Sequence, residues 1–134
     1  MADINIGAIL EALNNKVDLP TPSTPQNAVD YVVEKQDPTA DNNYTWYRKY
    51  KSGWVEQGGQ TANDAQSTVS TITLPVAMLD SNYTVSVVGT AIGNGYIFRA
   101  KNRTKTTFQI ACDTFSSGAN PTGARLWCAR GQSE

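Results

Sequence analysis

Four basic residues alternate with other residues in one short segment, namely Arg99, Lys101, Arg103 and Lys105. Side chains two positions apart point to the same side of an extended chain, so the spacing predicts a positive ridge along one strand. A ridge of this kind could bind a polyanion. Phosphate-bearing or acidic glycans suit it better than a nucleic acid, because the whole chain has a net charge of -1. A solvated strand face, or an edge strand that its charges protect against aggregation, explains the spacing equally well.

The segments on either side of the ridge are rich in small and polar residues, as exposed loops commonly are. GNG occupies residues 93–95, and TFSSGANPTG occupies residues 114–123. Loops carried by a rigid β scaffold are common places for binding residues. We therefore expect the ligand contacts to come from the ridge and both loops, at Asn94, Tyr96, Arg99, Lys101, Asn102, Arg103, Phe115 and Asn120.

A second candidate binding feature is an aromatic cluster between residues 44 and 54, which consists of Tyr44, Trp46, Tyr47, Tyr50 and Trp54. Aromatic rings stack on sugars and on bases, which would suit a lectin-like site. The cluster also fits a hairpin turning at KSG, in which Trp46 and Trp54 pack across neighbouring strands. Because cross-strand aromatic pairs commonly stabilise sheets, packing is the interpretation we favour.

Catalytic and metal chemistry have few candidate residues in this chain. The sequence contains no histidine, which removes the commonest general base and the commonest metal ligand. Glu34 and Glu56 could form the carboxylate pair of a glycoside hydrolase, but pairing with nearby lysines and arginines explains them better. Cys112 and Cys128 lack the C-x-x-C spacing of a zinc site, so we expect reduced, buried thiols. We predict no catalytic residue, no metal and no cofactor.

Residues 3–19 show the apolar spacing of a short amphipathic helix. Asp3 is placed to cap the first turn, and the apolar residues follow coiled-coil spacing, at Ile6, Leu10, Leu13 and Val17. So short a helix needs sister chains, or the body of its own domain, for stability. The proline-rich PTPSTP at residues 20–25 ends it. We predict a helical stalk and linker over residues 1–25 and a β domain over residues 26–134.

The pattern beyond residue 25 changes to short runs rich in valine, threonine, tyrosine and tryptophan, which is typical of an all-β domain. Alternation such as that of Tyr83, Val85 and Val87 predicts strands that bury one face, which favours an antiparallel β-sandwich. The expected strands span residues 29–35, 43–51, 53–57, 67–74, 82–89, 96–101, 105–113 and 124–129.

Membrane and nucleic-acid partners are not expected. No run of about eighteen apolar residues occurs, and the N-terminus lacks the basic and apolar regions of a secretory signal. We therefore expect a protein that is made in the cytoplasm and does not insert into a membrane. The 11 basic and 12 acidic residues also lack the basic excess of a nucleic-acid-binding protein.

Three sequence motifs resemble the distal C-terminal domain of tailed-phage tail fibres. The first is YVVEK followed by WYRKYKSGWVEQGG, within residues 31–59. The second is ITLPVAMLDSNYTVSV at residues 72–87, and the third is RLWCARG at residues 125–131, which is similar to the closing strand of H-type-lectin-like domains. The resemblance covers roughly residues 29–131. We interpret the WYR and EQGG residues as scaffold, because Gly58 and Gly59 fit a tight bend.

The resemblance implies an H-type-lectin-like antiparallel sandwich that forms a homotrimer at the distal end of a tail fibre in the virion. Residues 3–19 would then be the end of a trimeric stalk. The implied function is host attachment through lipopolysaccharide, another envelope glycan or an outer-membrane protein. Two alternatives remain open. One is a fibre-borne polysaccharide depolymerase that uses Glu34 and Glu56, and the other is a purely structural trimerisation and folding cap.

Overall fold

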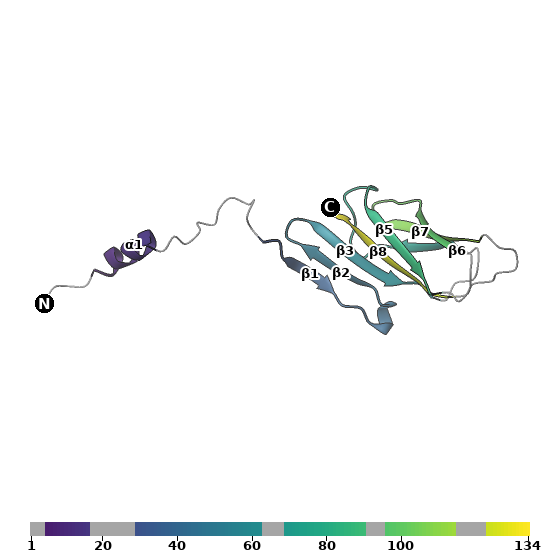
Figure 1. Ribbon diagram of the computed structural model, residues 1–134, viewed down its shortest axis with the longest axis horizontal. Helices are drawn as coiled ribbons and strands as arrows, with labels where there is room; N and C mark the ends of the chain where they lie inside the picture. The colour runs from purple at the N-terminus through teal and green to yellow at the C-terminus, as the bar shows by residue number, and fades with distance from the viewer. Residues whose placement is uncertain (1–4, 17–28, 63–68, 91–95, 115–122) are drawn as a thin grey trace.

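The computed structural model describes residues 5–16, 29–62, 69–90, 96–114 and 123–134 (Figure 1). Helix α1 (Ile6–Lys16) comes first, and a short 3-10 helix, η2 (Ala40–Asn42), follows the first strand. The strands are β1 (Val32–Gln36), β2 (Trp46–Tyr50), β3 (Trp54–Gln60), β4 (Ser70–Thr73), β5 (Thr84–Gly89), β6 (Tyr96–Lys101), β7 (Thr107–Thr114) and β8 (Arg125–Gln132). Each predicted strand is present, which confirms the all-β class.

The strands form two antiparallel sheets (Figure 1). Five strands pair in the order β1-β2-β3-β8-β5, and three pair in the order β4-β7-β6. The turn between β2 and β3 is the predicted KSG hairpin, in which the N–H of Gly53 donates to the carbonyl of Tyr50 at 2.9 Å. Gly53 has φ of 85°, a left-handed conformation that glycine adopts without strain.

The side chains that face each other from the two sheets form one core. Phe108 of β7 meets Trp127 of β8 edge to face, with ring centroids 5.5 Å apart and planes at 70°. Leu74, Met78, Tyr83, Ile110 and Ala129 complete the buried cluster. Burial of this apolar surface is the main favourable term that holds the sheets together. The β-sandwich, its H-type-lectin-like form and the trimer stay predictions.

The EQGG segment is part of β3, so the prediction of a tight bend at Gly58 and Gly59 is wrong. Gly58 pairs with Trp46 on one side and with Cys128 on the other. A Cβ on Gly58 would lie 2.7 Å from the carbonyl oxygen of Trp127 and 2.7 Å from Nε1 of Trp46. Glycine is therefore required because the indole of Trp46 lies directly over the strand, not because the chain turns.

Gln57 of the same segment fixes the connection between β4 and β5 to the five-stranded sheet. Its side chain is fully buried. The amide nitrogen donates to the carbonyl of Val76 at 2.9 Å, and the amide oxygen accepts the N–H of Val76 at 3.0 Å. This side chain satisfies both backbone groups of Val76 as a neighbouring strand would. The scaffold interpretation of the EQGG residues fits these contacts.

The pKa of the Tyr83 hydroxyl makes the stability of the fold depend on pH. Burial raises the pKa of Tyr83 above its usual 10.0, an effect larger than the lowering by the Arg103 guanidinium beside it. The folded chain therefore keeps this proton to a higher pH than the unfolded chain. The contribution of this group to the free energy of unfolding is complete below the pKa that Tyr83 has in the unfolded chain. It is lost as the pH rises through the higher pKa that Tyr83 has in the folded chain.

We expect the wild-type protein to lose stability between pH of about 8 and about 11, and Tyr83→Phe to lose less over the same range. The variant starts lower, because it lacks the hydrogen bond of 3.0 Å from the Tyr83 hydroxyl to the carbonyl of Thr107. Urea midpoints at both pH values measure the two changes. Equal losses in the two proteins would show that other groups cause the alkaline destabilisation.

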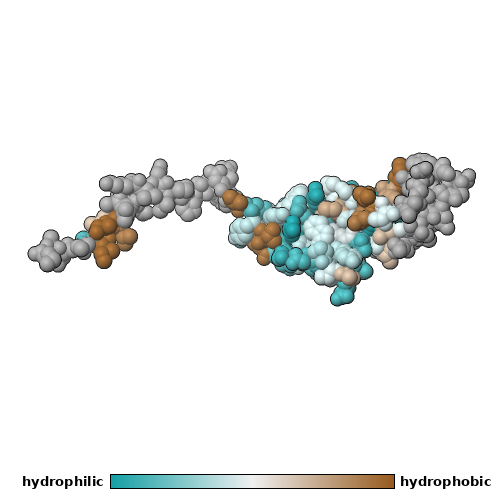
Figure 2. All heavy atoms as spheres, turned by 60° about the horizontal axis from the view of Figure 1, so that its bottom comes forward, coloured by the Kyte–Doolittle hydropathy of each residue, from teal (hydrophilic) through white to brown (hydrophobic). Residues whose placement is uncertain are grey.

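Helix α1 covers residues 6–16 of the predicted helix, and residues 3, 4 and 17–19 of that prediction lie outside the described residues. It begins at Ile6, because Oδ1 of Asn5 accepts the N–H of Ala8 at 3.1 Å, whereas Asp3 lies outside the described residues. Ile6, Ile9 and Leu10 are 68%, 49% and 62% exposed. Figure 2 shows this apolar surface as brown spheres on the helix. The boundary at residue 25 also lies outside the described residues and stays a prediction.

Three sequence expectations concern cysteines, metals and membranes. Both cysteines are free, and Cys112 is buried, but Cys128 is only half-buried because it lies on the face of β8 away from the core. Within the described ranges no group of three or more acidic or cysteine side chains could hold a metal ion. No helix in the same ranges has the length and apolar character needed to cross a membrane.

Candidate functional site

The predicted positive ridge does not continue over all four basic residues. Strand β6 ends at Lys101, and Asn102 has φ of 50°, which lies in the left-handed region. The alternation of an extended chain stops there. Arg99 and Lys101 share one face of β6, whereas Arg103 and Lys105 belong to the turn that follows. The prediction of one straight ridge is therefore wrong.

Ion pairs divide the same four residues into two kinds. Nε of Arg99 lies 2.5 Å from Oδ2 of Asp113, and Lys105 is paired with Glu134. Lys101 and Arg103 make no ion pair with any residue that the structure describes. Exposed pairs add little to stability, but they cancel charge locally. Of these four basic residues, Lys101 and Arg103 are therefore the two whose positive charge is uncompensated.

Lys101 and Arg103 line the same cavity, which has a volume of about 450 Å³. It lies where β5, an edge of the five-stranded sheet, approaches β6, an edge of the three-stranded sheet. We call it the basic cavity. Its other lining residues are Ser81, Asn82, Val85, Ala100 and Asn102. No carboxylate is among them, so the cavity offers cations, amides and a hydroxyl, which together suit an anion that also carries hydroxyl groups.

Contacts within the basic cavity hold its polar side chains in place. Nη1 of Arg103 donates to the carbonyl of Tyr83 at 2.6 Å, and the guanidinium carbon lies 5.9 Å from the centre of the Tyr83 ring. Nδ2 of Asn102 donates to Oε1 of Gln109 at 2.7 Å. A guanidinium has five N–H donors, so Arg103 keeps donors for a ligand after this contact.

The other predicted site residues are not brought into the basic cavity. Asn94, Phe115 and Asn120 lie outside the described residues. Tyr96 begins β6, and its position is five steps of about 3.3 Å each before Lys101. Arg99 is on the strand face of Lys101 but is paired with Asp113. Of the predicted site residues that the structure describes, three therefore line the basic cavity, namely Lys101, Asn102 and Arg103.

Sequence reasoning missed Ser81 and Asn82, which line the basic cavity together with Lys101. The segment DSNY at residues 80–83 forms a turn in which the N–H of Asn82 donates to Oδ1 of Asp80 at 2.6 Å. A run of Asp, Ser and Asn is a recognisable turn signal. Its position next to β6 is not visible in the sequence, because it depends on how the two sheets pack.

The two candidate catalytic carboxylates lie on opposite faces of the five-stranded sheet. Glu34 accepts a hydrogen bond of 2.6 Å from the hydroxyl of Tyr47. Tyr47 lies opposite Gln57 in the β2-β3 register, and Gln57 faces the core, so this contact is on the core face of the sheet. Glu56 lies opposite Arg48 in the β2-β3 register, on the other face of the sheet. There its carboxylate accepts a hydrogen bond of 3.3 Å from the Tyr50 hydroxyl. A glycosidase pair must flank one bond from a common cleft. These two carboxylates cannot do so.

The aromatic cluster does not pack as predicted. Trp46 lies opposite Gly58, so the expected pair with Trp54 is absent from the hairpin. Trp54 is 42% exposed and Tyr44 is 48% exposed. None of the five aromatic residues belongs to the buried core. The cluster is therefore mostly a surface feature, although Trp46, Tyr47 and Tyr50 are half-buried.

Solved structures with a similar fold include fibres of the R2 pyocin. A C-terminal fragment of the P. aeruginosa R2 pyocin fibre matches with a TM-score of 0.52 and 17% identity, over 75% of this chain and 26% of that chain. An N-truncated R2-type pyocin tail fibre matches with a TM-score of 0.54 and 13% identity, over 98% and 53%. No family model and no curated protein matches this sequence. The chain thus spans about a quarter to a half of these fibres and shares the fold of their matched parts.

Proposed function

We propose that this chain is the distal part of a phage or phage-like tail fibre, where it binds a receptor on the bacterial surface. The fold shared with the pyocin fibres supports this role. The observation that carries the binding part is the pair of uncompensated cations, Lys101 and Arg103, in one cavity without a carboxylate. The receptor is a glycan such as lipopolysaccharide, which presents anionic groups.

The basic cavity suits a phosphate or carboxylate on a sugar. Arg103 offers paired N–H donors that match two oxygens of such a group, and Lys101 adds a mobile charge. The amide of Asn82 and the hydroxyl of Ser81 suit the neighbouring hydroxyl groups of a glycan. A site of this size at the surface binds one sugar weakly. Several copies on one fibre would raise the effective concentration and hence the avidity.

The proposal includes assembly as a homotrimer with an H-type-lectin-like sandwich at the tip of the fibre, within the virion. The exposed apolar side chains of α1, at Ile6, Ile9 and Leu10, support association with sister chains, because a lone helix would leave them in water. Neither a nucleic acid nor insertion into a membrane is part of this function. The fibre tip needs no cofactor for it.

Replacing Lys101 and Arg103 together by alanine is expected to weaken binding to intact bacteria by at least about tenfold. The loss follows from removing both uncompensated charges of the basic cavity. Binding of the labelled 134-residue chain to a panel of strains, at low and high salt, measures the effect. The wild-type chain should bind less at high salt, because salt screens exposed charges, whereas the residual binding of the variant should depend less on salt.

The matched control replaces Arg99 and Lys105, whose charges Asp113 and Glu134 already compensate. This variant changes the net charge of the chain by the same amount as the first. Because the two removed charges are already compensated, binding should stay within about twofold of wild type. Equal losses in both double variants would contradict the assignment to the basic cavity. Binding that survives periodate oxidation of the cells would identify a protein receptor instead. Binding to no strain would favour the folding cap.

A further inference from the structure

A second cavity lies on the five-stranded sheet, beside the connection from β1 to β2. It has a volume of about 220 Å³ and is lined by Gln36, Asp37, Pro38, Trp46 and Arg48. None of these residues belongs to the basic cavity. We propose that this second cavity, here called the indole cavity, binds an uncharged sugar ring.

The indole of Trp46 provides the apolar surface of the cavity. It lies over Gly58, where an added Cβ would come within 2.8 Å of Cε2. Trp46 and Pro38 also line an adjoining cavity of about 320 Å³, together with Tyr44 and Leu126. Tyr44 and Leu126 are more than two-fifths exposed. A half-buried indole therefore lies between two neighbouring hollows, an arrangement that fits two consecutive units of a glycan.

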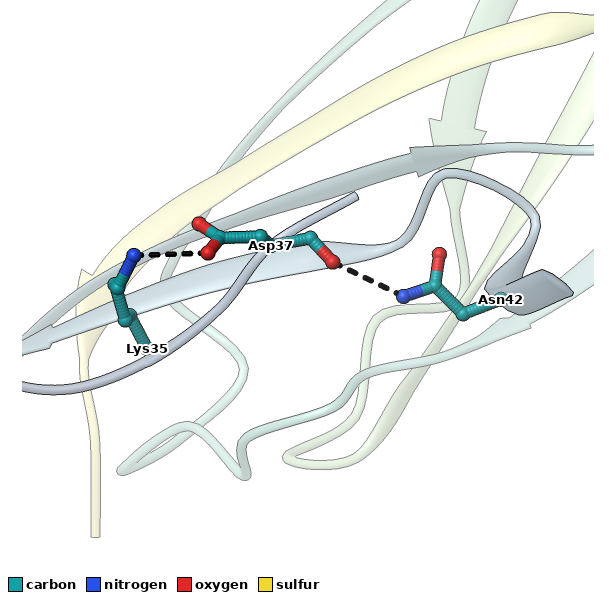
Figure 3. Close-up of polar contacts among 3 residues, drawn as sticks. All are labelled: Lys35, Asp37 and Asn42. Atoms are coloured by element: carbon teal, nitrogen blue, oxygen red, sulfur yellow. Dashed lines mark hydrogen bonds and ion pairs between the residues drawn. The ribbon is translucent and has the colours of Figure 1, made fainter. Parts of the chain in front are cut away.

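Hydrogen bonds fix the loop that carries the polar side of the indole cavity. Nζ of Lys35 lies 2.8 Å from Oδ2 of Asp37, and Nδ2 of Asn42 donates to the backbone carbonyl of Asp37 at 3.1 Å (Figure 3). Oδ1 of Asn42 in turn accepts the N–H groups of Thr39 and Thr45, at 2.9 and 3.0 Å. Asp37 is thus held from both its side chain and its backbone, which places the cavity rim before any ligand arrives.

The polar groups of the indole cavity retain unused bonding capacity. Nε2 of Gln36 donates to the carbonyl of Thr45 at 2.8 Å, so its Oε1 is left as an acceptor. Oδ1 of Asp37 accepts no hydrogen bond from the described residues. The guanidinium of Arg48 has neither a hydrogen bond nor an ion pair with any of them. Two acceptors and a planar donor therefore line the same cavity as the indole of Trp46.

This combination matches the chemistry of a pyranose ring. Such a ring presents an apolar C–H face that stacks on an indole and neighbouring hydroxyls that both donate and accept. Gln36 and Asp37 can accept from hydroxyls, and Arg48 can donate to two of them at once. The carboxylate of Asp37 disfavours binding of a phosphate in the indole cavity, whereas no carboxylate lines the basic cavity. The site rests on the proposed function only for the source of the sugar, a bacterial surface glycan.

The test uses the full 134-residue chain and soluble neutral disaccharides of glucose, galactose, mannose and rhamnose, followed by the indole N–H signals in NMR. One of these sugars should shift the Trp46 signal saturably and leave the Trp54 signal in place. Arg48→Ala should weaken that binding at least about tenfold. Trp46→Phe and Trp54→Phe assign the two signals. Trp54 does not line the indole cavity, so its variant should bind within about twofold of wild type.

Arg130→Ala is the charge-matched control for Arg48→Ala, because Arg130 lies on the same side of the sheet but outside the indole cavity, 3.8 Å from Glu56. Equal weakening by both variants, or no shift of Trp46 with any of the sugars, overturns the proposal. A shift of the Trp46 signal with adenosine but with none of the sugars also overturns the proposal and would indicate stacking of a nucleobase instead. The titration contains no cells, so its result is separate from that of the proposed function.

Discussion

Arg125→Ala is expected to lower the free energy of unfolding by about 3 kcal/mol. Arg125 begins β8 in the five-stranded sheet and is 1% exposed. Its Nη1 donates to Oγ of Ser70 in β4 at 2.9 Å and to the carbonyl of Ile110 in β7 at 3.3 Å. The guanidinium carbon also lies 5.9 Å from the ring of Phe98 in β6. One side chain thus contacts every strand of the other sheet, and its removal leaves a hole between the sheets.

Urea unfolding measures this change, with Arg130→Ala as the control on the same strand. The side chain of Arg130 is 59% exposed and, among the residues that the structure describes, makes only a long ion pair with Glu56, so its removal should cost less than about 0.5 kcal/mol. Similar midpoints for the two variants would mean that Arg125 does not hold the sheets together. An unchanged slope of the urea transition is needed to read the midpoint as stability.

Gly58→Ala is expected to destabilise the fold by a similar amount, about 3 kcal/mol, through crowding. In an unobstructed strand the same substitution would stabilise by about 0.5–1 kcal/mol, because alanine restricts the unfolded chain. Here the new methyl group would lie 2.7 Å from the carbonyl oxygen of Trp127, which is backbone and cannot rotate away. It would also push the indole of Trp46 off the strand, again from 2.7 Å. The sign of the effect is therefore reversed.

Gly59→Ala is the neighbouring comparison. Its Cβ would lie 3.0 Å from Oγ1 of Thr45 and 3.2 Å from the Trp127 ring, which are side-chain atoms that can move a little. The loss should be about 1 kcal/mol, again from urea midpoints. If alanine at position 58 proves as stable as glycine, the close approach of Trp46 and Trp127 to this strand is wrong.

The strands were predictable because short runs rich in valine, threonine and aromatic residues are separated by turn residues, and some of these runs alternate apolar and polar residues. Tyr83, Val85 and Val87 show this alternation, and β6 has the predicted bounds of residues 96–101. The bounds of β3 were missed because Gly58 and Gly59 resemble a turn in sequence. Their strand conformation follows from the tryptophans packed around them, which is a tertiary contact.

The candidate site was predictable only in part, for two physical reasons. Alternation in sequence continues past Lys101, but the left-handed conformation of Asn102 ends the extended chain. The partner of Lys105 is Glu134, which is 29 residues away. Charge compensation by such distant residues cannot be read from local spacing. Composition placed the positive charge in the right segment, and tertiary structure decided which two cations stay uncompensated.

The position of β8 has a consequence for how the chain is synthesised. This strand is the last of the strands that the structure describes, yet it lies between β3 and β5 in the five-stranded sheet (Figure 1). A nascent chain that still holds β8 inside the ribosome therefore has two unpaired strand edges and no Trp127 or Ala129 for its core. Native pairing must wait until β8 has left the ribosome, so folding depends on late, long-range contacts, which are slow to form. A chain that lost this strand through premature termination would be left as an aggregation-prone intermediate rather than as the folded domain.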